Sequence, residues 1–274
     1  MSEAPLVSVA MATYNCAPTL PDALASIENQ TYTNWELVAC DDASTDNSHA
    51  LLEEFAARHP GKVTVLRNEI NSKLSFSLNR CLAVANGELI ARMDGDDKCL
   101  PERFEKQVAF LTEHPELAVV GTAMRRFDET GEHDVLEYEA RPDRWSLRHK
   151  SPFAHATIVM RKPAYQVLNG YVDVPRTIRC EDRDLWFRFT AEGFAGANLP
   201  EPLYLVREDL DAIRRRTFQN RWNNFRTELI GFRLLKYPVG WFLNPFVQLG
   251  KALVPAKAML EYRKWQGRKV TVVG

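Results

Sequence analysis

In residues 1–100, short apolar runs alternate with segments whose apolar residues recur at helical spacing. Compact apolar runs predict buried strands, and apolar residues at helical spacing between them predict helices. The predicted strands cover 6–11, 35–40, 62–67 and 88–93, and the predicted helices cover 20–30, a segment around 51–55, and 73–85. This order predicts a parallel sheet with helices on both faces and a ligand crevice beyond the carboxyl ends of the strands.

The second part of the chain is less regular. A helix is expected after Pro101, and 122–150 is polar and irregular, with room for short strands. Further strands are expected at 117–121 and 156–160, and an amphipathic helix at 181–193. Beyond residue 210 the pattern becomes helical, basic and aromatic. We therefore expect one α/β domain over 1–210, divided near residue 100, and a helical extension over 211–274.

Charge separates the same two parts. The extension carries 13 Lys/Arg against 3 Asp/Glu, and residues 1–210 carry 22 against 33, although the whole chain has a net charge of −1. Basic segments with many aromatic residues are typical of contact with an anionic membrane surface. The alternative is a helical appendage that packs on its own domain or on a second subunit. No nucleic-acid recognition motif is present and the body is acidic, so no nucleic-acid partner is expected.

The cysteines and the N-terminal residues indicate the cellular compartment of the protein. The five cysteines are odd in number and form no CxxC pair, which argues against a disulfide framework or a zinc site. The first residues show neither a basic start nor a cleavable apolar run. No stretch of about 18–20 residues is free of charge and proline, so no spanning helix is expected. These features favour the cytoplasm.

Acidic side chains follow two of the predicted strands. Asp41 and Asp42 come directly after the second strand, where a carboxylate can accept a hydrogen bond from an N–H group of a nucleobase, or can merely cap the next helix. Asp94, Asp96 and Asp97 follow the fourth strand. Three carboxylates in four residues repel one another unless a cation lies among them, and oxygen ligands suit Mg²⁺ or Mn²⁺. An exposed acidic turn is the alternative.

Two other features of the sequence add candidate chemistry. Gly95 lets the backbone come close to a bulky ligand. Glu181 and Asp182 open the helix at 181–193, where an acid is stabilised by the helix dipole or serves as a general base.

Four motifs in order carry a resemblance to a known family. VSVAMATYN, ELVACDDASTDNS, GELIARMDGDD and CEDRDLWFRF resemble the family 2 inverting glycosyltransferases with the GT-A fold, over about residues 5–210. The spacing within RMDGDDKCLPERFEKQVAFL further resembles the members that build bacterial capsule, exopolysaccharide and lipopolysaccharide repeats. The resemblance implies a Rossmann-like, mostly parallel sheet, with nucleotide-sugar binding in 1–100 and acceptor binding in 101–210.

The resemblance also implies roles for single residues. Thr13 and Tyr14 match residues that line the nucleotide pocket, and Asp42 matches the carboxylate that reads the base. Lys73 falls near a basic residue that contacts the nucleotide in some members. Asp94 and Asp96 match the DxD signature, with Asp96 the more direct ligand of Mn²⁺ or Mg²⁺ and Asp94 nearer the ribose.

On the acceptor side, the resemblance assigns the base that activates the acceptor to Asp182, with Glu181 beside it. Trp186 is interpreted mainly as a packed helix residue that borders the acceptor site. His155 either contacts the acceptor or is a partly buried, hydrogen-bonded histidine. The chain departs from the family at Ala43 and Lys73, where glycine is usual or frequent, and at Leu78, where arginine is frequent.

The activity that follows is transfer of a sugar, with inversion, from a nucleotide diphosphate donor to a hydroxyl of a glycan or lipid-linked acceptor. UDP is the favoured nucleotide, and the expected location is the cytoplasm, peripheral at the inner face of the cell membrane. The alternatives are a nucleotidyltransferase, although TYNCAPTL lacks a glycine- and lysine-rich first loop, and an inactive nucleotide-sugar-binding protein. No GxGxxG follows the first strand, which argues against a dehydrogenase.

Overall fold

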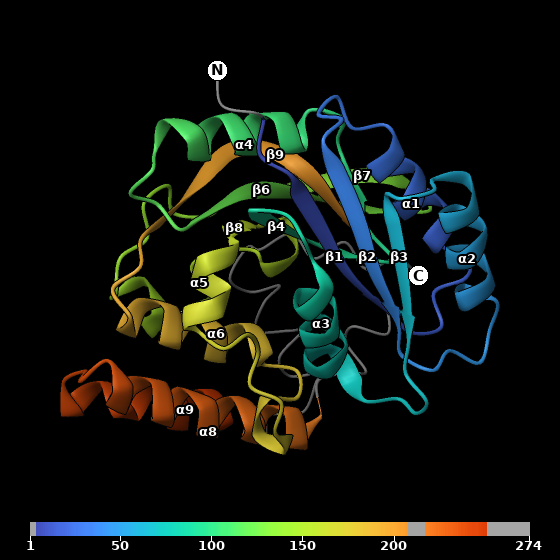
Figure 1. Ribbon diagram of the computed structural model, residues 1–274. Coiled ribbons are helices and arrows are strands. Elements are labelled where there is room, and N and C mark those ends of the chain that lie inside the picture. The colour runs from blue at the N-terminus through green and yellow to red at the C-terminus, as the bar shows by residue number, and fades with distance from the viewer. Residues whose placement is uncertain (1–3, 208–216, 251–274) are drawn as a thin grey trace.

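The computed structural model describes residues 4–207 and 217–250, and within them one mixed sheet forms the centre of the molecule (Figure 1). The strands run in the spatial order β3-β2-β1-β4-β8-β6-β9-β5, with β7 paired to β6. Their bounds are β1 Val7–Thr13, β2 Trp35–Asp41, β3 Val63–Arg67, β4 Leu89–Asp94, β5 Lys98–Cys99, β6 Val119–Asp128, β7 Gly131–Leu136, β8 Val159–Arg161 and β9 Gly196–Arg207.

The strands predicted in residues 1–100 form the parallel half of this sheet. β1 pairs in parallel with both β2 and β4, and β2 pairs in parallel with β3. The short strand β8 then pairs antiparallel with β4 and β6, while β9 is parallel to β6. The prediction of a mostly parallel, Rossmann-like sheet is confirmed.

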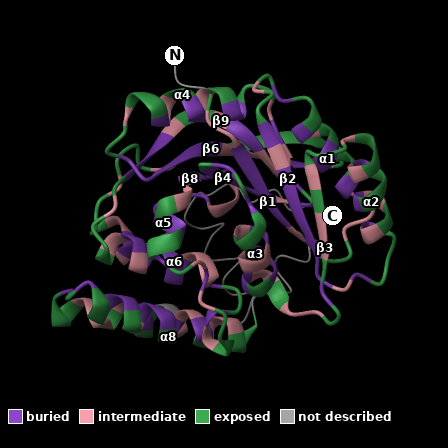
Figure 2. Cartoon of the chain, in the orientation of Figure 1, coloured by how far each residue is buried: buried purple, intermediate pink, exposed green. Residues whose placement is uncertain are grey.

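Helices cover both faces of the sheet, as the strand pattern predicted. Side chains of β1 alternate between two cores: Val9 packs with α1, α2 and α4, while Ala10 packs with α3, α5, α6 and α8. Figure 2 shows the strands mostly buried and the outer sides of the helices exposed. The helices are α1 Leu20–Glu28, α2 Ser48–Arg58, α3 Lys73–Val84, α4 Arg103–Glu113, α5 Lys162–Val167, α6 Glu181–Ala191, α8 Phe218–Leu234 and α9 Leu243–Gly250.

The described part of the C-terminal extension packs on α6. Gly231 of α8 lies against the ring of Phe187, and Arg183 of α6 forms a buried ion pair with Glu228 of α8 at 2.9 Å. The predicted boundary at residue 210 and the residues 211–216 and 251–274 lie outside the described residues. In the described parts of the chain, no helix is long and apolar enough to cross a membrane.

The structure differs from the sequence prediction in the second half. β6 extends to Asp128 and is followed by its hairpin partner β7, so the possible short strands expected within 122–150 form a regular hairpin. β9 was not predicted, because Pro200, Glu201 and Pro202 interrupt its apolar pattern. The β6–β9 register shifts opposite these residues, next to Thr122 and Ala123, and a bulge is where a strand tolerates proline.

Candidate active site

The carboxyl ends of three parallel strands meet at one edge of the sheet. In the register of β1, Thr13 pairs with Asp41 of β2, and Ala12 pairs with Asp94 of β4. Asp42 and Asp94 therefore lie on the two sides of the end of β1. A cavity of about 350 Å³ opens at this edge, a volume suited to a small-molecule ligand.

The cavity wall combines the strand ends with the start of α3 and the segment before α6. Most of the residues predicted to bind the donor lie in this wall, together with residues that were not predicted. The lining residues are Ala12, Thr13, Tyr14, Cys16, Asp42, Asn71, Lys73, Leu74, Ser75, Ser77, Asp94, Gly95, Asp96, Asp173, Ile178, Arg179 and Glu181.

Two polar side chains of this wall have a hydrogen-bonding position that a ligand could use. Thr13 is 2% exposed, and its Oγ1 has no hydrogen-bond partner within the described residues. Asp42 Oδ1 accepts hydrogen bonds from Asn68 Nδ2 at 2.6 Å and from the N–H of Ser72 at 2.7 Å, and Oδ2 accepts from the N–H of Lys73 at 2.9 Å. A carboxylate offers about four acceptor positions, so one remains on Oδ2 for a ligand N–H.

Asn68 is a supporting residue that the sequence analysis missed. Its Nδ2 also donates to Ser77 Oγ at 2.9 Å, and its Oδ1 accepts from Arg80 Nη1 at 2.6 Å. Both ends of the buried amide are thereby held, which fixes the orientation of Asp42. An asparagine directly after the third predicted strand was the only signal, and such residues are common in turns.

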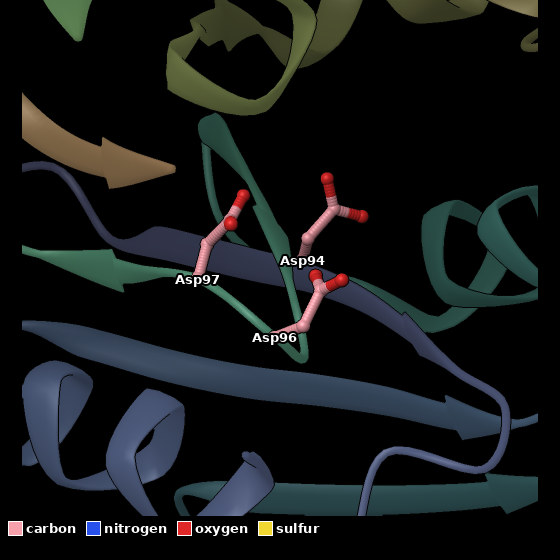
Figure 3. Close-up of side chains that lie close together, drawn as sticks. All are labelled: Asp94, Asp96 and Asp97. Atoms are coloured by element: carbon pink, nitrogen blue, oxygen red, sulfur yellow. The ribbon is translucent and has the colours of Figure 1, made fainter. Parts of the chain in front are cut away.

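The three carboxyl groups after β4 gather in a small region (Figure 3). One oxygen from each of Asp94, Asp96 and Asp97 lies within 4.8 Å of the others. Burial, and then the charges of Asp94 and Asp96, raise the pKa of Asp97 well above its usual range. Crowded carboxylates of this kind fit a divalent cation, which would relieve their repulsion.

Arg92 supplies a buried positive charge behind this group. Its guanidinium is 3% exposed, and Nη1 lies 2.5 Å from Asp94 Oδ2. The ion pair draws one oxygen of Asp94 toward the protein interior. Asp96, which is exposed, is therefore better placed than Asp94 to bind a cation directly.

The close packing around Gly95 gives a further reason for a glycine at this position. A Cβ at this position would lie 3.0 Å from Cys16 Sγ and 3.1 Å from Thr13 Cγ2. The glycine allows the turn after β4 to pack against the end of β1, in addition to lining the cavity.

Two departures from the family pattern coincide with unusual backbone conformations. Ala43 has φ 59° and Lys73 has φ 73°, in the left-handed region that favours glycine. The resemblance expects glycine at these two positions, and glycine adopts this conformation without steric cost. The Lys73 side chain lies in the cavity wall, and its Nζ donates to Asn71 Oδ1 at 2.8 Å.

Glu181 and Asp182 take different positions at the start of α6. Glu181 lines the cavity, and burial together with the charge of Asp182 raises the pKa of Glu181 to about 7. Asp182 is not among the lining residues; its Oδ2 accepts a hydrogen bond from Ser151 Oγ at 3.0 Å. The first turn of α6 thus presents one carboxylate to the cavity and the next one to the segment that holds Ser151.

The two residues expected near the acceptor differ in burial. Trp186 is fully buried, with its ring 4.8 Å from that of Phe153, which agrees with its interpretation as a packed helix residue. His155 is half-buried; its Nε2 lies 2.8 Å from the hydroxyl of Tyr171, and burial of the ring holds its pKa well below the usual range. This geometry agrees with the partly buried, hydrogen-bonded alternative for His155.

Comparison with known proteins places the chain in a class of enzymes. The model of glycosyl transferase family 2 matches residues 8–167. The chain is 45% identical over 264 residues to the putative glycosyltransferase EpsE of Bacillus subtilis, covering 96% of this chain and 95% of that protein. It is 32% identical over 234 residues to the amylovoran biosynthesis glycosyltransferase AmsE of Erwinia amylovora, covering 84% and 85%.

Solved structures with low sequence identity share the fold. TarS of S. aureus, residues 1–349 in complex with UDP-GlcNAc, superposes with a TM-score of 0.69 at 19% identity, covering 90% of this chain and 71% of that one. The mannosyltransferase PcManGT of Pyrobaculum calidifontis, in complex with GDP-Man and Mn²⁺, gives a TM-score of 0.66 at 19% identity, covering 98% and 82%. The fold is that of the GT-A glycosyltransferases, and the chain belongs to glycosyl transferase family 2.

Proposed function

We propose that the protein is an inverting, metal-dependent enzyme that transfers a sugar from a nucleotide diphosphate donor to a hydroxyl group of a glycan or lipid-linked acceptor. The observation that carries the proposal is the convergence of Asp42, Asp94, Asp96 and Glu181 on one cavity. A UDP-sugar is the first donor to test, because Asp42 keeps an acceptor position suited to the imide N–H of uracil.

We give the donor-side residues the roles that the resemblance implies, and their positions in the cavity wall support these roles. Asp42 orients the base, and Thr13 Oγ1 and Tyr14 contact the nucleoside from the end of β1. Lys73 lies where its ammonium group can approach the nucleotide. Asp94 and Asp96 would hold Mn²⁺ or Mg²⁺, which supplies charge stabilisation to the leaving diphosphate.

The transfer step requires one proton acceptor. The acceptor hydroxyl oxygen forms a bond to the anomeric carbon while the bond from that carbon to the diphosphate oxygen breaks, and the nucleoside diphosphate leaves with the electron pair. We assign the hydroxyl proton to Asp182, as the resemblance implies; Asp182 is not a lining residue of the cavity, whereas its neighbour in sequence, Glu181, is. A positioned base contributes about 10²–10⁴ in rate. Displacement in one step inverts the anomeric centre.

The setting is the synthesis of a bacterial surface polysaccharide, such as a capsule or lipopolysaccharide. The relatives support this, since the name of AmsE refers to amylovoran biosynthesis. We place the protein in the cytoplasm at the inner face of the membrane, with residues 211–274 in contact with anionic lipid. A lipid-linked acceptor would be within reach there.

A thermal-shift screen tests the proposal. UDP-, dTDP- and GDP-sugars are added with and without Mn²⁺, and the donor that stabilises the fold is then assayed for sugar transfer to extracted lipid-linked glycans. We expect stabilisation that needs both donor and ion. Stabilisation without transfer to any acceptor would indicate a nucleotide-sugar-binding protein, and no stabilisation by any donor would contradict the proposal.

A further inference from the structure

The segment 218–247 concentrates exposed apolar side chains. Of the seventeen large apolar side chains exposed in the described parts of the chain, eight lie in this segment of thirty residues. They are Phe218, Trp222, Ile230 and Leu234 of α8, Val239 of the 3₁₀ turn Val239–Phe242, and Leu243, Phe246 and Val247 of α9. Val239 is 86% exposed and Leu243 is 67% exposed. A contiguous patch of this kind marks an interaction site.

The spacing arranges these side chains on one side of each helix. On α8 the exposed apolar residues recur every fourth position, with Arg226 in place of one of them. Gly231 and Phe232 lie on the other side of the helix and face α6. α9 continues the patch, because the ring of Phe246 packs at 4.8 Å against Phe225 of α8. We call the exposed side of α8, the 3₁₀ turn and α9 the docking face.

The charge of the docking face is positive. Arg226, Arg233 and Lys236 are exposed on it or at its border. Glu228, the acid of α8, is buried and neutralised by Arg183. Apolar and aromatic side chains interspersed with arginine are the composition of helices that lie at anionic lipid surfaces.

The positive charge of the docking face favours an anionic lipid surface over two other possible binding partners. A second copy related by a two-fold axis would bring the same cations opposite one another. Residues 251–274 of the chain carry six Lys/Arg against one Asp/Glu, so they too would be repelled. An anionic bilayer complements the face in both charge and polarity.

The docking face is joined to the Glu181 end of the cavity. Asn223 Nδ2 of α8 donates to the carbonyl of Ile178 at 3.3 Å, and Thr227 Oγ1 lies 3.4 Å from Cys180 Sγ. Ile178, itself 38% exposed, lines the cavity two residues before Cys180. We infer that the docking face binds an anionic lipid bilayer and thereby holds the acceptor end of the cavity beside the membrane. The inference deepens the proposed function, from which it takes the acceptor and the contact of residues 211–274 with anionic lipid, but flotation tests the lipid binding independently of sugar transfer.

Vesicle flotation of the full chain tests the inference with a matched pair of variants. Val247 on α9 and Val167 on α5 are both 58% exposed, so an aspartate replaces the same side chain at the same exposure in two places. Vesicles of phosphatidylcholine alone are compared with vesicles that also contain phosphatidylglycerol. We expect the wild type and Val167→Asp to float with the anionic vesicles, and Val247→Asp to bind about tenfold more weakly. High salt should weaken the binding of all three.

Several results would overturn the inference. Equal flotation of the two variants would contradict it, and so would a wild type that does not float. A wild-type dimer in light scattering that Val247→Asp dissociates would instead make the docking face an interface between two copies of the chain. Circular dichroism establishes that both variants are folded. Because flotation needs neither donor nor turnover, a protein that floats but transfers no sugar would retain the lipid-binding face and lose the proposed function.

Discussion

Glu181 is a half-buried carboxyl group on a cavity wall, and its raised pKa makes its protonation depend on pH near neutrality. Burial is the main cause of its raised pKa, and the charge of Asp182 adds to it, while Arg92 and Arg179 act in the opposite direction. With a pKa of about 7, Glu181 exchanges its proton in the range where general bases are most effective. At the residue scale, the first turn of α6 thus offers two carboxyl groups with different surroundings.

A stability measurement checks this environment. An unfolded glutamate titrates near 4.5, so between pH 4.5 and about 7 the folded protein binds the Glu181 proton more tightly than the unfolded chain does. The free energy of unfolding should therefore fall as the pH rises through this window, by on the order of 1–3 kcal/mol. In Glu181→Gln this part of the fall should be absent when urea unfolding is compared at pH 5 and pH 8.

Glu192→Gln is the control for that experiment, because Glu192 is an exposed glutamate at the other end of the same helix. Its pH dependence should equal that of the wild type. If Glu181→Gln retains the full decline, the cavity wall does not bury the Glu181 carboxyl group.

At the scale of elements, α6 is held between the sheet and α8. Trp186 and Phe189 face the core, and Phe187 faces Gly231 of α8. The buried ion pair between Arg183 and Glu228 lies in the same contact. The position of Glu181 and Asp182 therefore depends on a helix from the extension that follows the family domain.

Gly231→Ala tests how closely the two helices are packed. A Cβ at this position would lie 2.2 Å from the Phe187 ring, so the helices must separate or the ring must move. Overpacking costs about 1–3 kcal/mol, and alanine gains roughly 1 kcal/mol over glycine in a helix. Because the added Cβ would overlap the ring, we expect the cost to exceed the gain, with a net loss of up to about 2 kcal/mol in the free energy of unfolding, measured by urea denaturation.

Gly240→Ala provides the comparison, since no atom lies within 4 Å of the added Cβ. Its free energy of unfolding should change by less than about 0.5 kcal/mol. An equal effect of the two substitutions would mean that the α6–α8 contact is looser than the structure describes.

At the scale of the whole molecule, the two halves of the chain contribute different parts of one site. Residues 12–96 supply the candidate donor and metal groups of the cavity wall, and residues 173–181 supply the rest of that wall, with Asp182 next to it in sequence. Since these groups come from segments far apart in the sequence, donor binding and proton transfer should be separable by mutation.

Asp96→Ala and Asp182→Asn test this separation. With the donor found in the screen and Mn²⁺, the thermal shift of the wild type should be lost in Asp96→Ala and retained in Asp182→Asn. Sugar transfer by Asp182→Asn should nevertheless fall by about 10²–10⁴. If Asp182→Asn lost donor binding and turnover together, its assignment as the base would be contradicted. A Mn²⁺-dependent shift in Asp96→Ala would contradict the metal role.

Much of the donor side could be predicted from the sequence because it depends on local order. Compact apolar runs and helices of period 3.6 are visible in residues 1–100, and the carboxyl ends of parallel strands share one edge of a sheet. Asp42, Asp94 and Asp96 lie at or just after such ends. Their convergence therefore follows from the parallel sheet that the alternation of strands and helices and the four ordered motifs predict.

Tertiary structure alone decided the features that depend on contacts between distant segments. In the sequence, Asn68 looks like an ordinary turn residue and Arg92 like an ordinary strand residue. Their roles become visible only through their contacts, since Asn68 donates a hydrogen bond to Asp42 and Arg92 forms an ion pair with Asp94. Adjacent helix residues point about 100° apart, so the sequence could not say which of Glu181 and Asp182 faces the cavity. That direction was settled by the packing of α6 between the sheet and α8, because the rotation of a helix about its axis is fixed by what its apolar faces bury.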